Sequence, residues 1–304
     1  MTDIPAADTA PEDVVVIDTE QTRDHRVRFT LPGGRLTMQL RALRSQEARA
    51  QGLSGQDYAR LVTGHDGGHL AFCVCDGVGS SYRGDFAARY LGIRLVSRLF
   101  ALDGVPRRIQ ALERDLRAEM ERWAHDAQRE LLATSGPEVG SALEREVLEE
   151  LRVDYGSEAV FLAGRVDVST AMSMELGRGK ASAARMLLCW MGNVQARLRS
   201  GGRIQSFDGM DDDRARWSSA RGVRGRLRIA TLTATAPWRL IVHTDGFAAL
   251  SANIFTFSEE ELRREEQRLL DLPTSDDMTL LAIEWAADGN AGASAWTAER
   301  QSRG

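Results

Sequence analysis

The chain has 304 residues, of which 43% are hydrophobic and 27% charged, and its formal net charge is -5. A chain of this length can bury a full core, so we expect one large globular domain. The negative charge argues against a nucleic-acid-binding protein, and no apolar stretch approaches the roughly 20 residues that span a bilayer. Residues 1–13 lack the basic and apolar regions of a signal peptide, which predicts a cytoplasmic location.

Three ranges with different composition divide the chain. Residues 1–25 are rich in Asp, Thr, Ala and Pro and show little periodicity, which predicts a disordered lead. Residues 26–286 carry the periodic segments and form the expected domain. Residues 287–304 are rich in Gly, Ala, Ser and Asn and are expected to be a flexible tail.

Hydrophobic periodicity predicts helices and strands along the domain. The first half contains strands within 26–43 around a turn at Pro32-Gly33-Gly34, a strand pair at 58–62 and 70–75, a helix at 86–99, a long amphipathic helix at 109–131 and a short helix at 141–151. The second half contains a strand at 158–168, a hairpin of 185–190 and 194–199 around Gly192-Asn193, a strand at 203–207, a pair at 227–235 and 238–243, a helix at 257–270 and a strand at 278–285. Many antiparallel strands with helices in two blocks predict an α+β fold with two sheets covered by helices.

The three cysteines are too few for a disulfide framework. Cys73 and Cys75 lie two residues apart on a predicted strand, so both side chains share one face of the sheet. We interpret them as small buried hydrophobic residues rather than as a metal or redox pair.

Acidic dipeptides stand at the ends of three apolar, strand-like runs. Asp76-Gly77 follows 70–75, Asp245-Gly246 follows 239–244, and Asp276-Asp277 precedes 278–283. An isolated Asp-Gly is usually a turn, but three such strands would deliver their carboxylates to a common edge, with Asp57 as a fourth candidate. Two carboxylates about 4 Å apart repel by roughly 4 kcal/mol at an effective dielectric of about 20. A divalent cation would remove that repulsion, and oxygen-only ligands favour Mg²⁺ or Mn²⁺ over zinc.

Six short motifs follow one another along the chain: Gln56-Asp57, Asp76-Gly77-Val78-Gly79, Gly156-Ser157-Glu158-Ala159-Val160, Met191-Gly192-Asn193, His243-Thr244-Asp245-Gly246 and Asp276-Asp277-Met278-Thr279. This ordered set resembles the metal-dependent protein phosphatase 2C family of Ser/Thr phosphatases over roughly residues 26–285. The resemblance implies a four-layer α-β-β-α sandwich with two antiparallel sheets flanked by helices. It also implies two Mn²⁺ or Mg²⁺ ions at one end of the sheets.

The resemblance assigns roles to individual residues. Asp76 would bridge both ions, the Gly77 carbonyl would bind one of them, and Asp57 would serve the same side. Asp245 and Asp276 would hold the other ion, whereas Asp277 is the less favoured ligand of its pair. A water acidified between the ions would attack phosphorus, so Asp76 and Asp245 would be the central catalytic residues. The expected partners are phosphorylated proteins and a cognate Ser/Thr kinase system.

Several positions depart from the family pattern. Gly52 stands where an arginine usually binds the substrate phosphate, and Arg49 or Arg83 could replace that arginine. Val78 removes one candidate general acid. Asn193 stands where an aspartate is common, and its neutral amide would bind a third cation less well.

These departures leave the function open among three hypotheses. The first is a protein Ser/Thr phosphatase, the second a catalytically impaired phosphatase-like regulatory or binding module, and the third a hydrolase of small phosphoesters. His243 invites a general-acid role, but its predicted position on a buried strand favours a structural one.

Overall fold

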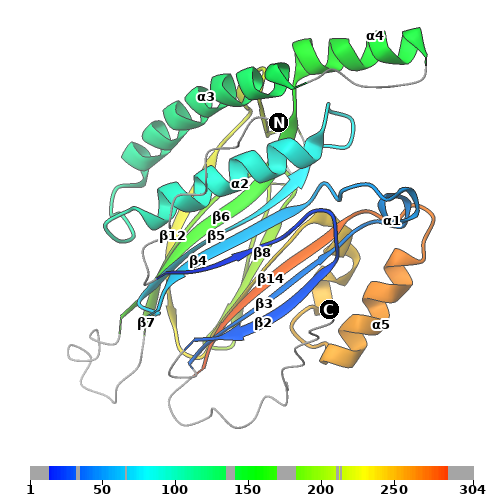
Figure 1. Cartoon of the computed structure of the whole chain (residues 1–304). Coiled ribbons are helices and arrows are strands. Elements are labelled where there is room, and N and C mark those ends of the chain that lie inside the picture. The colour runs from blue at the N-terminus through cyan, green and yellow to red at the C-terminus, as the bar shows by residue number, and fades with distance from the viewer. Residues whose placement is uncertain are drawn as a thin grey trace, which may run out of the picture.

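Two antiparallel sheets stacked face to face form the centre of the computed structural model (Figure 1). The structure describes residues 14–31, 35–65, 67–134, 141–169, 183–209, 212 and 214–286. Helices cover the outer face of each sheet, so the predicted α+β, four-layer α-β-β-α arrangement is confirmed. None of the helices within these residues is both long and apolar enough to cross a membrane.

The first sheet has eight strands. They are β1 (Val14–Asp18), β4 (Tyr58–Gly64), β5 (His69–Gly77), β6 (Glu158–Ser169), β7 (Ala183–Met191), β10 (Arg216–Ser218), β11 (Gly222–Arg224) and β12 (Arg228–Thr235). One path runs β1-β4-β5-β6-β10-β11, and β7 pairs with both β6 and β12.

The second sheet has six strands in the order β2-β3-β14-β13-β8-β9. They are β2 (His25–Thr30), β3 (Leu36–Leu43), β14 (Met278–Trp285), β13 (Trp238–His243), β8 (Gln195–Ser200) and β9 (Arg203–Phe207). The helices and helical turns are α1 (Gln46–Gln51), α2 (Gly84–Phe100), α3 (Ile109–Ala133), α4 (Ala142–Glu150), η1 (Leu151–Tyr155), η3 (Asp245–Asn253) and α5 (Glu259–Leu270).

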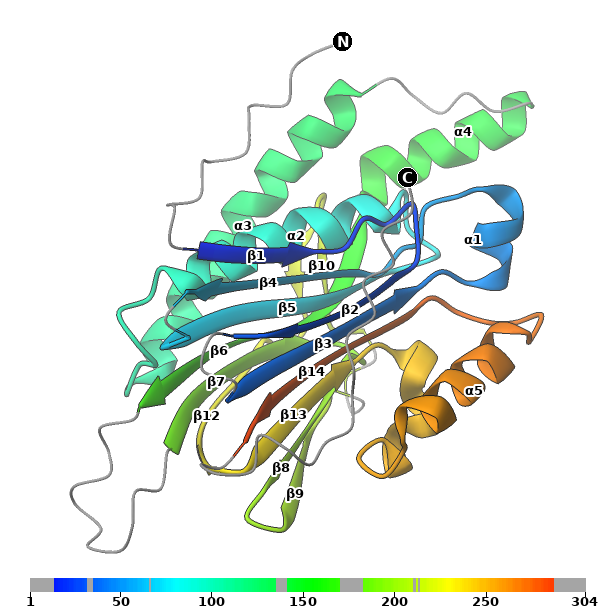
Figure 2. The same cartoon turned by 60° about the horizontal axis from the view of Figure 1, so that its bottom comes forward.

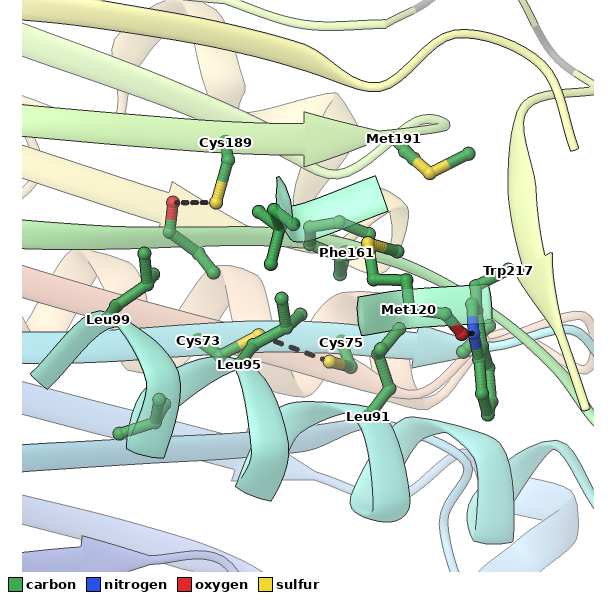
Figure 3. Packing of buried hydrophobic residues seen from close by; sticks show 14 of the residues in the cluster. Cys73, Cys75, Leu91, Leu95, Leu99, Met120, Phe161, Cys189, Met191 and Trp217 are labelled. Atoms are coloured by element: carbon green, nitrogen blue, oxygen red, sulfur yellow. Dashed lines mark hydrogen bonds between the residues drawn. The ribbon is translucent and has the colours of Figure 1, made fainter. Parts of the chain in front are cut away.

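Three hydrophobic clusters fill the spaces between the four layers. The first lies between α2, α3 and the first sheet, and Figure 3 shows part of it, including Leu91, Phe161 and Trp217. Cys73 and Cys75 belong to this cluster, fully buried with their sulfur atoms 3.2 Å apart, as expected of small core residues. The second cluster lies between the two sheets, and the third joins the second sheet to η3 and α5 (Figure 2).

A buried ion pair attaches α5 to the second sheet. Nη1 of Arg41 on β3 donates to Oε1 of Glu266 on α5 at 2.6 Å, and the two side chains are 1% and 0% exposed. Arg41 also pairs with Glu259 at the start of the helix. Each charge removed from water here therefore has a partner, which buried ions require.

The ordered structure begins earlier than we predicted. Residues 14–18, expected within the disordered lead, form β1 and pair with β4 from Val14 opposite Gly64 to Asp18 opposite Arg60. Their sequence Val-Val-Val-Ile-Asp is rich in β-branched residues that favour strands. Residues 1–13, the turn at 32–34 and the tail at 287–304 lie outside the described residues.

Two predicted strand pairs are wrong, although the strands themselves exist. β7 and β8 flank Gly192-Asn193 but belong to different sheets, and so do β12 and β13. Gly192 has a φ of +79°, and a Cβ there would lie 2.3 Å from Val160 Cγ1. This turn therefore carries the chain from one sheet to the other through a conformation that favours glycine.

Candidate metal centre

A cavity of about 620 Å³ opens at the end of the two sheets. Carboxylates from three separate parts of the chain line it: Asp76, Asp245 and the pair Asp276 and Asp277. Glu47 of α1 adds a further carboxylate to the lining. The common edge predicted for the acidic dipeptides therefore exists.

Asp76 reaches the cavity from the end of β5, where it pairs with Val160 of β6. The backbone beyond it runs against the start of α2: a Cβ on Gly77 would lie 2.4 Å from the carbonyl carbon of Gly84. Only a residue without a side chain allows this approach. Burial, followed by the charges of Asp245, Asp276 and Asp277, raises the pKa of Asp76 well above its ordinary value.

Asp245 follows β13 and is the first residue of η3. Its Oδ2 accepts a hydrogen bond from Nδ2 of Asn193 at 2.8 Å. Asn193, which stands where the family commonly has aspartate, therefore donates to a candidate metal ligand. Burial raises the pKa of Asp245, and the bonds from Asn193 and from backbone N–H groups partly offset the rise. Asp276 lies on the neighbouring segment, and its pKa is raised by burial and by the charge of Asp245.

Asp57 is buried but is not part of the cavity lining. Its Oδ2 accepts a hydrogen bond from the Thr244 hydroxyl at 2.8 Å, and Oγ1 of Thr244 in turn accepts the N–H of Thr279 at 3.0 Å. Burial, followed by the charges of Asp76 and Asp277, raises the pKa of Asp57 well above its ordinary value. Asp57 therefore interacts electrostatically with the cavity carboxylates, although it does not line the cavity.

Asp277 connects two backbone segments. Its two carboxylate oxygens accept the N–H groups of Ser45 at 2.6 Å and of Gln56 at 2.5 Å. Each oxygen of the side chain therefore already accepts one backbone hydrogen bond. The loop before α1 and the loop before Asp57 are thereby fixed to the same edge of the second sheet.

The donor set fits hard divalent cations. Every candidate ligand supplies oxygen, which Mg²⁺ and Mn²⁺ prefer. Burial, together with repulsion from neighbouring carboxylates, raises the pKa of Asp57 and of Asp76. Within the described residues, no three acidic, His or Cys side chains form a compact group ready to hold an ion. The carboxylates are instead distributed around the cavity wall.

The residues considered as replacements for the missing arginine lie elsewhere. Arg49 pairs with Asp24 at 2.7 Å and Arg83 with Asp85 at 3.2 Å, and neither lines the cavity. Gly52 ends α1 in a left-handed conformation with φ +66°, which accounts for glycine at this position. Among the described residues that line the cavity, the one cation is Arg216, which we did not predict from the sequence.

His243 is fully buried and does not line the cavity. Its Nδ1 lies 2.9 Å from the carbonyl oxygen of Thr244 and its Nε2 lies 3.2 Å from the Ser251 hydroxyl. Burial lowers its pKa, which favours the neutral ring. These contacts agree with the structural role that we favoured.

Comparison with known proteins gives matches to solved structures only. No protein-family model matches the chain, and no curated protein matches it. The structure of RsbX in complex with magnesium aligns with a TM-score of 0.50 and 14% identity over 86% of this chain and 100% of RsbX.

Two further structures align with lower scores. PppA, a key regulatory component of T6SS in Pseudomonas aeruginosa, has a TM-score of 0.46 and 15% identity over 83% of this chain and 98% of PppA. The catalytic domain of the serine threonine protein phosphatase PstP, in complex with two manganese ions, has a TM-score of 0.45 and 15% identity over 83% of this chain and 99% of that domain. With two antiparallel sheets between helical layers, this chain has the fold of the protein phosphatase 2C family.

Proposed function

We propose that this protein hydrolyses phosphoserine or phosphothreonine on protein partners with the help of two Mn²⁺ or Mg²⁺ ions. The observation that carries the proposal is the convergence of Asp76, Asp245 and Asp276 on one cavity. The first and last of these residues, Asp76 and Asp276, lie 200 positions apart in the chain.

Asp76, Asp245, Asp276 and the carbonyl of Gly77 would hold the ions, and the nearby buried Asp57 would support them. Two such ions would supply positive charge for the phosphoryl oxygens and would acidify a water molecule for attack on phosphorus. The protein itself contributes position: the Asn193 amide fixes one oxygen of Asp245 and leaves its Oδ1 outside that bond. The magnesium named in the RsbX structure supports the choice of ion.

The test is hydrolysis of p-nitrophenyl phosphate and of a phosphothreonine peptide with Mn²⁺, with Mg²⁺ and with a chelator. Asp76→Asn and Asp245→Asn are expected to lose at least about 100-fold in turnover, as removal of a central electrostatic group does. Asp115→Asn, on the exposed face of α3, is the matched control and keeps wild-type turnover. Metal-independent turnover, or full turnover in Asp76→Asn, would contradict the proposal.

A second candidate is a phosphatase-like regulatory module. It is favoured by the lack of a compact three-ligand group among the described residues and by the bond between Asn193 and Asp245. A folded protein that binds Mn²⁺ and phosphoprotein without turnover would support it. Faster turnover of nucleotides or sugar phosphates than of phosphopeptides would instead favour a small-phosphoester hydrolase. The cytoplasmic location and the cognate kinase remain predictions.

A further inference from the structure

We infer that Arg216 binds the phosphoryl group of the substrate in the carboxylate-lined cavity. The inference rests on the proposed function, because it concerns the dianionic substrate of the same site. It starts from an imbalance of charge: five carboxylates line the cavity, whereas Arg216 is the one Arg, Lys or His among the described lining residues. A phosphate dianion entering this cavity needs a cation, and arginine is well suited to bind it through two N–H groups.

The register of the first sheet places Arg216 in the same row as Asp76. Asp76 pairs with Val160, and Trp217 of β10 pairs with Ala159. One more step along β10 puts Arg216 beside Val160, two strands from Asp76. Adjacent strands lie about 4.8 Å apart, so the two backbones are about 10 Å apart, within the combined reach of the two side chains.

The side chain of Arg216 also points to the correct face. Trp217 is fully buried against α2 and α3: its ring stacks on Tyr90 at 6.0 Å, and its Nε1 donates to the carbonyl of Met120 at 3.0 Å (Figure 3). Successive residues of a strand point to opposite faces. Arg216 therefore faces away from the helices, toward the side of the sheet that holds Asp76 and Val160.

Glu158 contacts the guanidinium of Arg216 and helps to position it. Its Oε2 lies 3.3 Å from Nη1 of Arg216, and its Oε1 lies 3.2 Å from Nη1 of Arg224. Arg216 is the inner member of the group, with a side chain 23% exposed, whereas Arg224 is 40% exposed and does not line the cavity.

Helix α3 fixes the hairpin that carries Arg216. Beside the Trp217 bond, Oε1 of Glu121 accepts the N–H of Val223 at 3.2 Å, and Nη2 of Arg117 donates to the Val223 carbonyl at 3.4 Å. These contacts hold β10 and β11 where the two-residue pairing with β6 alone would be weak. The cation is therefore pre-positioned, which saves entropy on binding.

The experiment measures binding of inorganic phosphate to the Mn²⁺-loaded full chain by calorimetry. Arg216→Gln is expected to weaken phosphate binding roughly 10- to 100-fold, the range for a charge-assisted hydrogen bond. Arg216→Lys keeps the positive charge and should lose less phosphate affinity. Arg224→Gln, which removes the other partner of Glu158, is the matched control and stays within about threefold. Mn²⁺ affinity, measured for every variant, should stay within about threefold of wild type and also shows that each variant is folded.

The outcomes separate this inference from the proposed function. Wild-type turnover with equal phosphate affinity in Arg216→Gln would overturn the inference and leave the function standing. If phosphate binding depends on Arg216 but the protein shows no turnover, the inference would be supported and the proposed phosphatase activity would be contradicted. An Mn²⁺-loaded wild type that binds no phosphate, or an equal loss in Arg224→Gln, would also overturn the inference.

Discussion

Replacing Asp76 with asparagine should stabilise the metal-free protein while abolishing its stabilisation by Mn²⁺. Asp76 is buried, and its charge faces Asp245, Asp276 and Asp277. A sphere with the cavity volume of about 620 Å³ is about 10 Å across, and at that separation one pair of carboxylates repels by roughly 1.7 kcal/mol at an effective dielectric of about 20. Proton uptake relieves part of this repulsion, so we expect a gain of about 2 kcal/mol at pH 7.5.

The assay is thermal and urea unfolding of wild type and Asp76→Asn, each with chelator and with saturating Mn²⁺. A gain of about 2 kcal/mol corresponds to a rise in Tm of roughly 4–8 °C for a domain of this size. Wild type should gain further stability from Mn²⁺ and the variant should not. Asp115→Asn on exposed α3 is the control and should change neither value.

The pH dependence gives the sign of the effect. A carboxyl group whose pKa is raised in the folded state holds its proton more tightly there than in the unfolded chain. Stability therefore falls as pH rises from the unfolded pKa, about 3.9, toward the raised folded value. The difference between variant and wild type should accordingly vanish near pH 4 and grow toward neutral pH. A metal-free Asp76→Asn protein less stable than wild type at pH 7.5 would refute the reasoning.

Three further predictions concern contacts elsewhere in the structure. Arg41→Met leaves a buried carboxylate without its main partner and should cost about 3–5 kcal/mol of unfolding free energy, measured in urea. Gly77→Ala places a methyl group 2.4 Å from the Gly84 backbone and should cost about 1–3 kcal/mol and weaken Mn²⁺ binding in calorimetry. Asn193→Asp replaces a donor to Asp245 by a like charge, so it should lower the Tm of the metal-free protein and increase the gain from Mn²⁺.

Each of these predictions has a control or a contradicting result. Arg268→Gln, in an exposed pair with Glu265 on the same helix as Glu266, should change stability by less than about 0.5 kcal/mol. A Gly77→Ala protein with wild-type stability would mean that α2 shifts freely at its start. An Asn193→Asp protein with wild-type metal-free Tm would show that the two side chains separate.

Local patterns in the sequence predicted most helices and strands because each pattern reports burial of one element. The helix α3 is an example: its apolar residues recur every three or four positions and are buried against the first sheet. The same patterns failed for the sheet to which β7 and β8 belong. A turn motif such as Gly192-Asn193 fits a hairpin, but whether the next strand pairs or crosses depends on distant partners.

The candidate site divides in the same way. Asp76, Asp245 and Asp276 were predictable because each is marked by an adjacent strand. Arg216 was not, since its place depends on pairing between β10 and β6, some 58 positions apart in the chain. The three residues of β10 carry no periodicity of their own. The sequence showed only that Gly52 replaces a phosphate-binding arginine. That Gly52 also ends helix α1 could be seen only from its left-handed backbone conformation.

Charge balance connects the two proposals. Asp57, Asp76, Asp245 and Asp276 are the four carboxylates proposed to hold or support the ions. If all four are ionised, their charges equal the four positive charges of two divalent ions, and a phosphate dianion then brings this set of groups to -2. Arg216 reduces that deficit, and Asn193 keeps it from growing because a neutral amide stands beside Asp245. Asn193→Asp should therefore bind Mn²⁺ more tightly and inorganic phosphate more weakly than wild type. Tighter binding of both would show that metal charge, and not Arg216, determines how this cavity holds phosphate.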